Sequence, residues 1–171
     1  DTEKIALSIE KLEDIYVVPA FAGLGAPYWD MYSRGAIFGL TRDTGKEHII
    51  KATLESLAYQ TKDIIDVMEK DSGLKLTSLK VDGGACMNNY LMQFQSDLLG
   101  SEVNRPEIIE TTAMGAGYLA GLKSNIWDKD QIIKNQKIDR SFNSKIKKME
   151  REMMYNGWKK AVNRTFNWIE K

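Results

Sequence analysis

The stretch "KVDGGACMNNYLMQFQSDLLG" (80–100) places two adjacent glycines, Gly83 and Gly84, between an apolar run and a helical pattern. The run over 76–82 has the apolar content of a strand, and apolar residues recur at helical spacing over 88–99. A tight turn needs one glycine, whereas two leave a length of backbone bare. The stretch therefore predicts a strand–turn–helix unit. Its turn is either a plain glycine turn or a place where a flat or charged ligand lies against the backbone.

Polar residues flank this turn on both sides. Asn88 and Asn89 open the predicted helix, so one of them is expected to cap it. The other would keep a free amide suited to a purine edge or a ribose. Asp82 either accepts N–H groups of the turn or orients a metal-bound water. Cys86 is expected to be a small buried side chain, because the single histidine leaves no partner to activate it.

The turn does not match the two best-known phosphate-binding patterns. No Gly-Lys-Ser/Thr follows the glycines, so it is not a P-loop. The third glycine of the dinucleotide fingerprint is also missing.

Strands and helices alternate along the rest of the chain. We expect strands at 16–20, 35–41, 76–82 and 101–106, and helices at 46–70, 88–99, 110–125 and 144–170, after an amphipathic opening helix with Ile5, Leu7, Ile9 and Leu12 apolar. This alternation predicts an α/β fold with a partly parallel sheet. The simplest interpretation is that residues 1–171 form one domain.

Smaller patterns predict how these elements pack. Gly39 suggests a close backbone approach, and His48 is expected at the surface. Close helix packing is expected at the four-residue spacing of Ala113, Gly117 and Gly121, and a satellite core is expected at Tyr28, Trp29 and Tyr32. The candidate contacts of the final helix are Met149, Met153, Trp158, Ala161, Val162 and Trp168.

Composition narrows the class of protein. The 171 residues carry 24 basic and 24 acidic side chains, which is not the charge balance of a nucleic-acid or membrane binder. One cysteine and one histidine argue against an internal disulfide and against a His/Cys metal site. No apolar run approaches the ~20 residues of a membrane span, and no signal peptide opens the chain, so a cytoplasmic location is expected. Asp1 stands inside a helical pattern, which suggests a piece of a longer protein.

Taken together, the motifs resemble the glycerol kinases, within the wider family of sugar and polyol kinases. The segment 23–42 is similar to their hallmark, apart from Met31, where proline is usual, and Ser33, where alanine is usual. Further matches are the family's second signature, with Gly35, Gly39, His48, Ala52 and Glu55, its adenosine motif over 81–100, its second connecting helix over 111–122, and the glycerol kinase ending "YNGWKKAV" (155–162).

The resemblance implies an actin-like ATPase fold of two RNase H-like domains, with ATP and Mg²⁺ in the cleft between them. This chain would be most of the C-terminal domain, a mixed sheet flanked by helices without its first strands. Gly84 and Asn88 would hold the adenine nucleotide, Gly83 and Ala85 would shape the same wall, and the helix over 111–121 would belong to the hinge.

The same resemblance places the catalytic base, the glycerol-binding residues and most Mg²⁺ ligands upstream of Asp1. No catalytic or metal-binding residue is therefore assigned within the chain, which alone is expected to be inactive. Its expected partners are the N-terminal kinase domain, ATP and glycerol, and further copies of itself. The alternatives are another sugar kinase of the xylulose or gluconate type, and a non-catalytic actin-like module that binds nucleotide or assembles.

Overall fold

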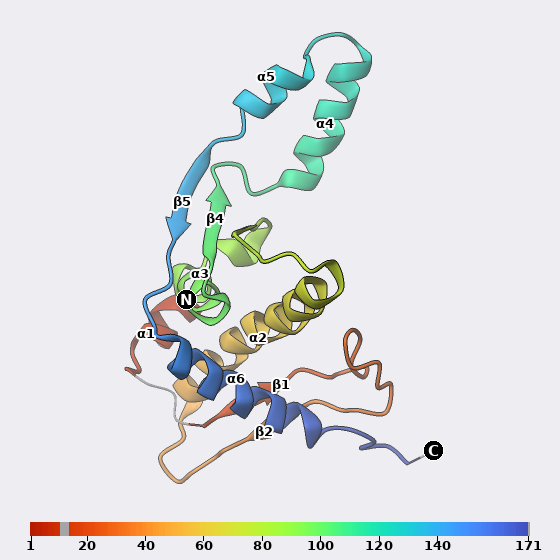
Figure 1. The fold of residues 1–171 in the computed structure, drawn as a ribbon. Helices are drawn as coiled ribbons and strands as arrows, with labels where there is room; N and C mark the ends of the chain where they lie inside the picture. The colour runs from red at the N-terminus through yellow and green to blue at the C-terminus, as the bar shows by residue number, and fades with distance from the viewer. Residues whose placement is uncertain (11–13, 171) are drawn as a thin grey trace.

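The computed structural model describes residues 1–10 and 14–170, and Leu12 of the predicted opening helix lies outside them. Six helices, five strands and one 3-10 turn are formed within these residues (Figure 1). In chain order they are α1 (Thr2–Leu7), β1 (Tyr16–Val18), β2 (Ala36–Phe38), α2 (Lys46–Ser72), β3 (Ser78–Lys80), the 3-10 turn (Gly84–Met87), α3 (Asn89–Leu99), β4 (Glu102–Pro106), α4 (Thr111–Lys123), α5 (Lys129–Lys134), β5 (Ile138–Phe142) and α6 (Lys148–Asn163).

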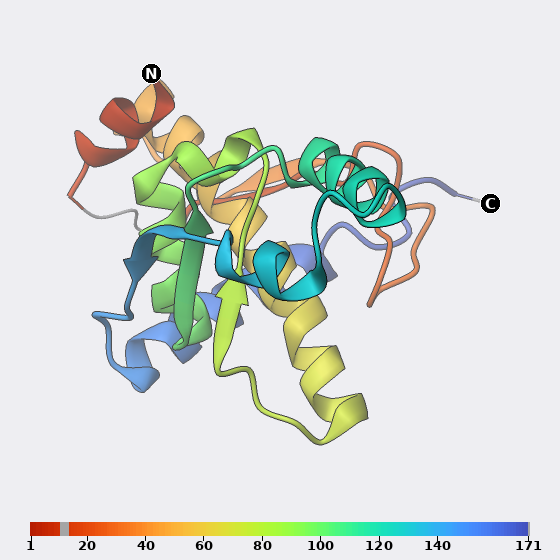
Figure 2. The same ribbon diagram turned by 90° about the horizontal axis from the view of Figure 1, so that it is seen from above.

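The main sheet is mixed and has the strand order β3-β4-β5. β3 and β4 are parallel and joined by α3, while β5 returns antiparallel beside β4. Helix α3 contacts β4 and β5 as well as α2 and α6, so it lies between the sheet and these two helices. β1 and β2 form a separate antiparallel pair next to α2 and α6. Figure 2 shows the α4–α5 hairpin on the side of the molecule where β3 ends.

An aromatic cluster around Tyr59 forms the centre of the core. The Tyr59 ring of α2 stacks on Trp158 of α6, with centroids 5.2 Å apart and planes at 7°. The centre of the Tyr59 ring also lies 5.5 Å from that of Phe94 in α3, in an edge-to-face contact, and 5.8 Å from that of Tyr16 in β1. Such pairs contribute about 0.5–1.5 kcal/mol each beyond the area they bury. One side chain therefore ties α2 to three other elements.

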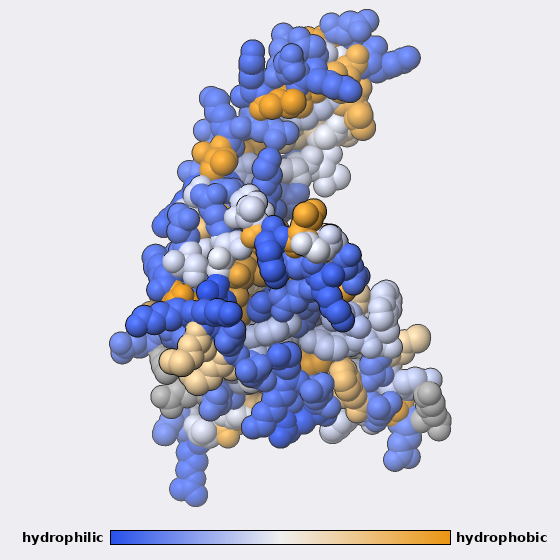
Figure 3. Space-filling view, viewed as in Figure 1, coloured by the Kyte–Doolittle hydropathy of each residue, from blue (hydrophilic) through white to orange (hydrophobic). Residues whose placement is uncertain are grey.

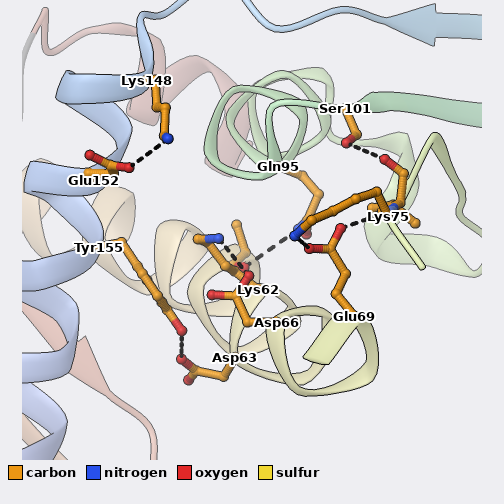
Figure 4. A network of polar contacts seen from close by, with 12 residues as sticks. Lys62, Asp63, Asp66, Glu69, Lys75, Gln95, Ser101, Lys148, Glu152 and Tyr155 are labelled. Carbon is orange, nitrogen blue, oxygen red and sulfur yellow. Dashed lines mark hydrogen bonds and ion pairs between the residues drawn. The ribbon is translucent and has the colours of Figure 1, made fainter. Parts of the chain in front are cut away.

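A buried carboxylate completes the contact between α2 and α6. Asp63 accepts hydrogen bonds from the Tyr155 hydroxyl at 2.6 Å and from the Trp158 indole N–H at 2.8 Å. Figure 4 shows Tyr155 reaching from α6 to this aspartate. The figure also shows Glu69, near the end of α2, paired at 2.6 Å with Lys75 in the segment that leads to β3. The Glu69–Lys75 pair thus holds the segment through which the chain enters the sheet.

The predicted strands and helices are present, but two elements were not predicted. α5 and β5 lie in the polar segment between the last two predicted helices. Asp128 caps α5 and exchanges reciprocal hydrogen bonds with Gln131, which together form a capping box. This pattern can be recognised in the sequence. β5 has four exposed residues and only Phe142 buried, so hydrophobic alternation gave no signal for it.

Several packing predictions are confirmed. An added Cβ at Gly39, whose φ is +83°, would overlap the Asp14 carbonyl oxygen, which is the close approach expected there. Trp158, Ala161 and Val162 of α6 are buried.

Other packing predictions are wrong. Met149, Met153 and Trp168 are exposed, because α6 turns them away from the core or ends before them. The close helix packing predicted at Ala113, Gly117 and Gly121 is not formed. An added Cβ at Gly117 would meet no atom within 4 Å, and one at Gly121 would overlap the Trp127 ring, which follows α4 in the chain and is not part of a helix.

Two further expectations change in detail. His48 is half-buried, and its Nδ1 accepts from the Gly45 N–H at 3.1 Å, so it caps α2 rather than lying free at the surface. Tyr28 packs against Phe166 beside the main core, as expected of a satellite core, but Trp29 is 77% exposed.

A second buried acid lies on α2, facing α3. Glu55 is 7% exposed and accepts a 2.5 Å hydrogen bond from the Tyr90 hydroxyl. Burial raises the pKa of Glu55 to about 7, because the loss of hydration outweighs the Tyr90 hydrogen bond and the nearby Lys51 charge. Burial thus disfavours the charged form of this acid, so that its pKa of about 7 keeps it neutral below that pH.

We expect Glu55→Gln to change how stability depends on pH. Because the folded-state pKa of Glu55 is about 7 against an ordinary 4.5, its stabilising contribution is complete below pH 4.5 and is lost as the pH rises through 7. The free energy of unfolding of the wild type should therefore fall relative to the variant across this window, by up to about 3 kcal/mol. Urea unfolding of both proteins between pH 4.5 and 8 measures this, and a constant difference would contradict it.

Candidate functional site

The site begins where β3 ends, at the glycine turn. Gly83 has φ +74° and ψ 174°, an extended conformation at positive φ that essentially only glycine adopts. Its N–H donates to the Ile109 carbonyl at 2.9 Å, and its own carbonyl accepts from the Cys86 N–H at 3.2 Å. The 3-10 turn over Gly84–Met87 then leads into α3. Gly83 is thus required by the backbone of the turn.

Gly84 is different, because nothing in the fold requires it. An added Cβ would meet no atom within 4 Å, and both Gly84 and Ala85 are exposed. The backbone here lies bare at the carboxyl end of a parallel strand, the edge at which ligands bind in α/β sheets. This geometry favours the ligand-binding alternative for the turn over the plain turn.

A cavity of about 600 Å³ opens beside the turn, a size typical of small-molecule sites. It lies between the ends of β3 and β4 and the α4–α5 hairpin, and its lining includes Asp82, Asn104, Thr111, Tyr118 and Lys137. The Asp82 carboxylate accepts a hydrogen bond from the Thr111 hydroxyl, so it ties the turn to the start of α4. Figure 3 shows this hairpin at one end of the molecule, with hydrophobic side chains among its hydrophilic ones.

Asn88 is the one of the two asparagines that caps the helix. Its Oδ1 accepts from the Leu91 N–H at 3.0 Å, which satisfies one of the free donors of the first turn of α3. Its Nδ2 donates to the Thr2 hydroxyl of α1 over 3.3 Å, at an exposed position. The Nδ2 group of Asn88 therefore makes one long contact at the surface, next to the bare backbone.

Asn89 does not carry the free amide that was the expectation for the second asparagine. Its Nδ2 donates to the Glu3 carboxylate of α1 at 3.0 Å, and its Oδ1 accepts from Arg105 and Arg140. The prediction was wrong because these three partners come from distant parts of the chain. Asn89 is thus part of the support of the turn rather than of its open face.

Cys86 is buried behind the turn, as expected of a small apolar side chain. It is 1% exposed, and burial raises the pKa of its thiol, which disfavours the reactive thiolate. Among the described residues, no group of three or more His, Cys, Asp or Glu side chains is arranged to hold a metal ion.

Comparison with known proteins shows the family of the chain. Residues 3–124 match the C-terminal domain of the FGGY family of carbohydrate kinases. The chain belongs to this family. It is 58% identical over 170 residues to a glycerol kinase of Caldanaerobacter subterraneus, an alignment that covers 99% of this chain and 34% of that protein. The chain thus spans about a third of the length of the curated relatives it matches.

Solved structures of the family confirm the fold. The glycerol kinase of Plasmodium falciparum, solved with ADP, is 36% identical and superposes with a TM-score of 0.86 over 96% of this chain and 33% of its own. A gluconate kinase of Lactobacillus acidophilus superposes with a TM-score of 0.74 at 18% identity over the same shares, a likeness in fold alone. The expected actin-like ATPase type of fold is therefore correct.

Within residues 1–10 and 14–170, no helix is long and apolar enough to cross a membrane.

The two glycines of the turn should respond differently to alanine. Gly83→Ala should lower the free energy of unfolding by about 1–2 kcal/mol, because an L-residue is strained at positive φ. Gly84→Ala should leave it unchanged, because the added methyl group meets no protein atom. Urea unfolding of the two variants beside the wild type gives both values, and equal losses would show that Gly84 also serves the fold.

Proposed function

We propose that the protein carrying this chain is a glycerol kinase, which transfers the γ-phosphoryl group of ATP to glycerol, and that this chain supplies part of its nucleotide site. The observation that carries the proposal is 58% identity to a glycerol kinase over 99% of the chain. The remaining two thirds of such a protein would supply the catalytic base, the glycerol site and most ligands of the Mg²⁺ that accompanies ATP.

Four residues of the turn form the proposed nucleotide wall. Gly84 offers backbone with open space in front of it, and Asn88 stands at the edge with an exposed amide. Gly83 and Ala85 shape the same surface. Phosphoryl transfer depends on positioning and on stabilising charge rather than on covalent chemistry by the protein. The role of this turn is therefore to hold the nucleotide while groups elsewhere act on the phosphates.

Two observations weigh against the alternatives. Identity falls to 18% for the gluconate kinase and to 16% for a xylulose kinase of Rhodospirillum rubrum, against 58% for the glycerol kinase. A module that only assembles would not need the bare backbone at Gly84, which the fold itself does not require.

The surface of α4 and the edge of β3 support further partners. Leu119, Ile126 and Ile133 of the α4–α5 region are each at least 66% exposed, which is unusual for apolar side chains gathered in one part of the molecule. β3 is an edge strand of the sheet as described. We propose that the N-terminal part of the kinase covers the apolar α4–α5 surface and the edge of β3, and that α4 belongs to the hinge between the domains. We further propose that the kinase works as a homo-oligomer in the cytoplasm.

Gly84→Val in the full-length protein should raise the KM for ATP by about 30-fold, equivalent to about 2 kcal/mol, because the side chain would occupy the space of the nucleotide. The KM for glycerol should stay close to the wild-type value. Steady-state kinetics with each substrate varied in turn measures both constants. Equal increases in the two would indicate misfolding and would contradict the assignment.

Residues 1–171 alone should show no glycerol-dependent turnover at saturating ATP, Mg²⁺ and glycerol, because the chain is not expected to contain the base. Light scattering should also show self-association, since an open strand edge and apolar surface favour it. A coupled ADP-release assay on the purified chain tests the first point. Turnover would show that catalytic groups lie within these residues, and a stable monomer would show that the sheet edge is protected.

A further inference from the structure

A buried arginine on β4 reaches across to the turn that carries Gly84. Arg105 is 7% exposed, and its Nη1 donates to the carbonyl oxygen of Cys86 at 3.1 Å and of Met87 at 3.5 Å. Both carbonyls lie at the junction between the 3-10 turn and α3, where backbone groups run short of helical partners. The turn that presents bare backbone to solvent is thus held from the neighbouring strand.

The other edge of the same guanidinium is held by β5. Asp139 Oδ2 accepts from Arg105 Nε at 2.8 Å and lies 2.6 Å from Nη2. The planar group therefore faces a carboxylate with one edge and the turn carbonyls with Nη1. A lysine, whose donors all sit on one nitrogen, cannot span these two sets of acceptors. A buried cation also needs such a counter-charge to be tolerated.

The contacts continue from the turn into α3 and α1. Arg105 Nη1 also donates to Asn89 Oδ1 at 3.2 Å, and the Asn89 backbone N–H donates to Glu3 at 2.8 Å. The Arg105 guanidinium lies 5.7 Å from the centre of the buried Phe142 ring on β5. A change at this guanidinium would therefore reach the turn and the start of α3 together.

We propose that Arg105 and Asp139 are a positioning pair that fixes the turn over 83–88 in the conformation that receives the nucleotide. Neither residue is placed against the nucleotide itself. Asp139 lies beyond the residues that match the FGGY domain, 3–124, so this part of the chain would set nucleotide affinity without carrying a motif. The proposal rests on the proposed function.

The test uses the full-length protein, with the dissociation constant of ADP measured by calorimetry and the KM values by steady-state kinetics. Arg105→Lys keeps the positive charge but loses the planar set of guanidinium donors. ADP should therefore bind about tenfold more weakly, and the KM for ATP should rise in parallel. The KM for glycerol and kcat should stay within about twofold. Asp139→Asn leaves Arg105 in place without its counter-charge and should raise the dissociation constant of ADP by about threefold.

Arg140→Lys is the matched control. Arg140 lies directly opposite Arg105 in the β4–β5 register and also donates to Asn89. Among the described residues, the hydrogen bonds from a side chain to the Cys86 and Met87 carbonyls come from Arg105 and not from Arg140. The ADP affinity of the Arg140→Lys variant should equal that of the wild type. Equal weakening by Arg140→Lys and Arg105→Lys would overturn the proposal, because charge near Asn89 would then explain the effect.

The outcomes separate this proposal from the proposed function. A wild-type protein that binds no ADP overturns both. If the wild type binds ADP and Arg105→Lys binds it equally well while melting at a lower temperature, only the positioning role is overturned. If Arg105→Lys does not fold, Asp139→Asn decides alone, and wild-type ADP affinity in that variant overturns the positioning role.

Discussion

The stacking of Tyr59 on Trp158 is the contact on which the rest of the structure depends. It joins the longest helix, α2, to α6, and the same tyrosine ring meets Phe94 of α3 and Tyr16 of β1. Helix α3 is packed between these helices and the sheet, and the strand it contacts, β4, pairs with β3. Aromatic rings suit this role because they bury a large area with few rotatable bonds.

Around this centre, the turn is built from two kinds of constraint. The first is local, because Gly83 takes an extended conformation at positive φ and Asn88 caps the helix that follows. The second is tertiary, because Ile109 and Arg105 hold the turn through backbone groups. Gly84 takes part in neither, and its freedom from the needs of the fold is the clearest structural sign that the turn serves a ligand.

The sequence predicted the local half of this site well. The glycine pair, the capping asparagine and the strand–turn–helix order all follow from rules that act over a few residues. The prediction failed at Asn89, whose partners Glu3, Arg105 and Arg140 are separated from it along the chain. It also missed β5, because an exposed edge strand shows little hydrophobic alternation.

The sequence by itself determined the family, the alternation of strands and helices, and the position of the bare turn. Tertiary structure alone decided which side chains support that turn. Arg105 and Asp139 are separated by 34 positions and meet because β5 returns antiparallel beside β4. It also decided that Gly117 of α4 faces open space, although its spacing is typical of close packing. The physical reason is that spacing along a helix fixes which residues share a face, whereas only the three-dimensional arrangement fixes what lies against that face.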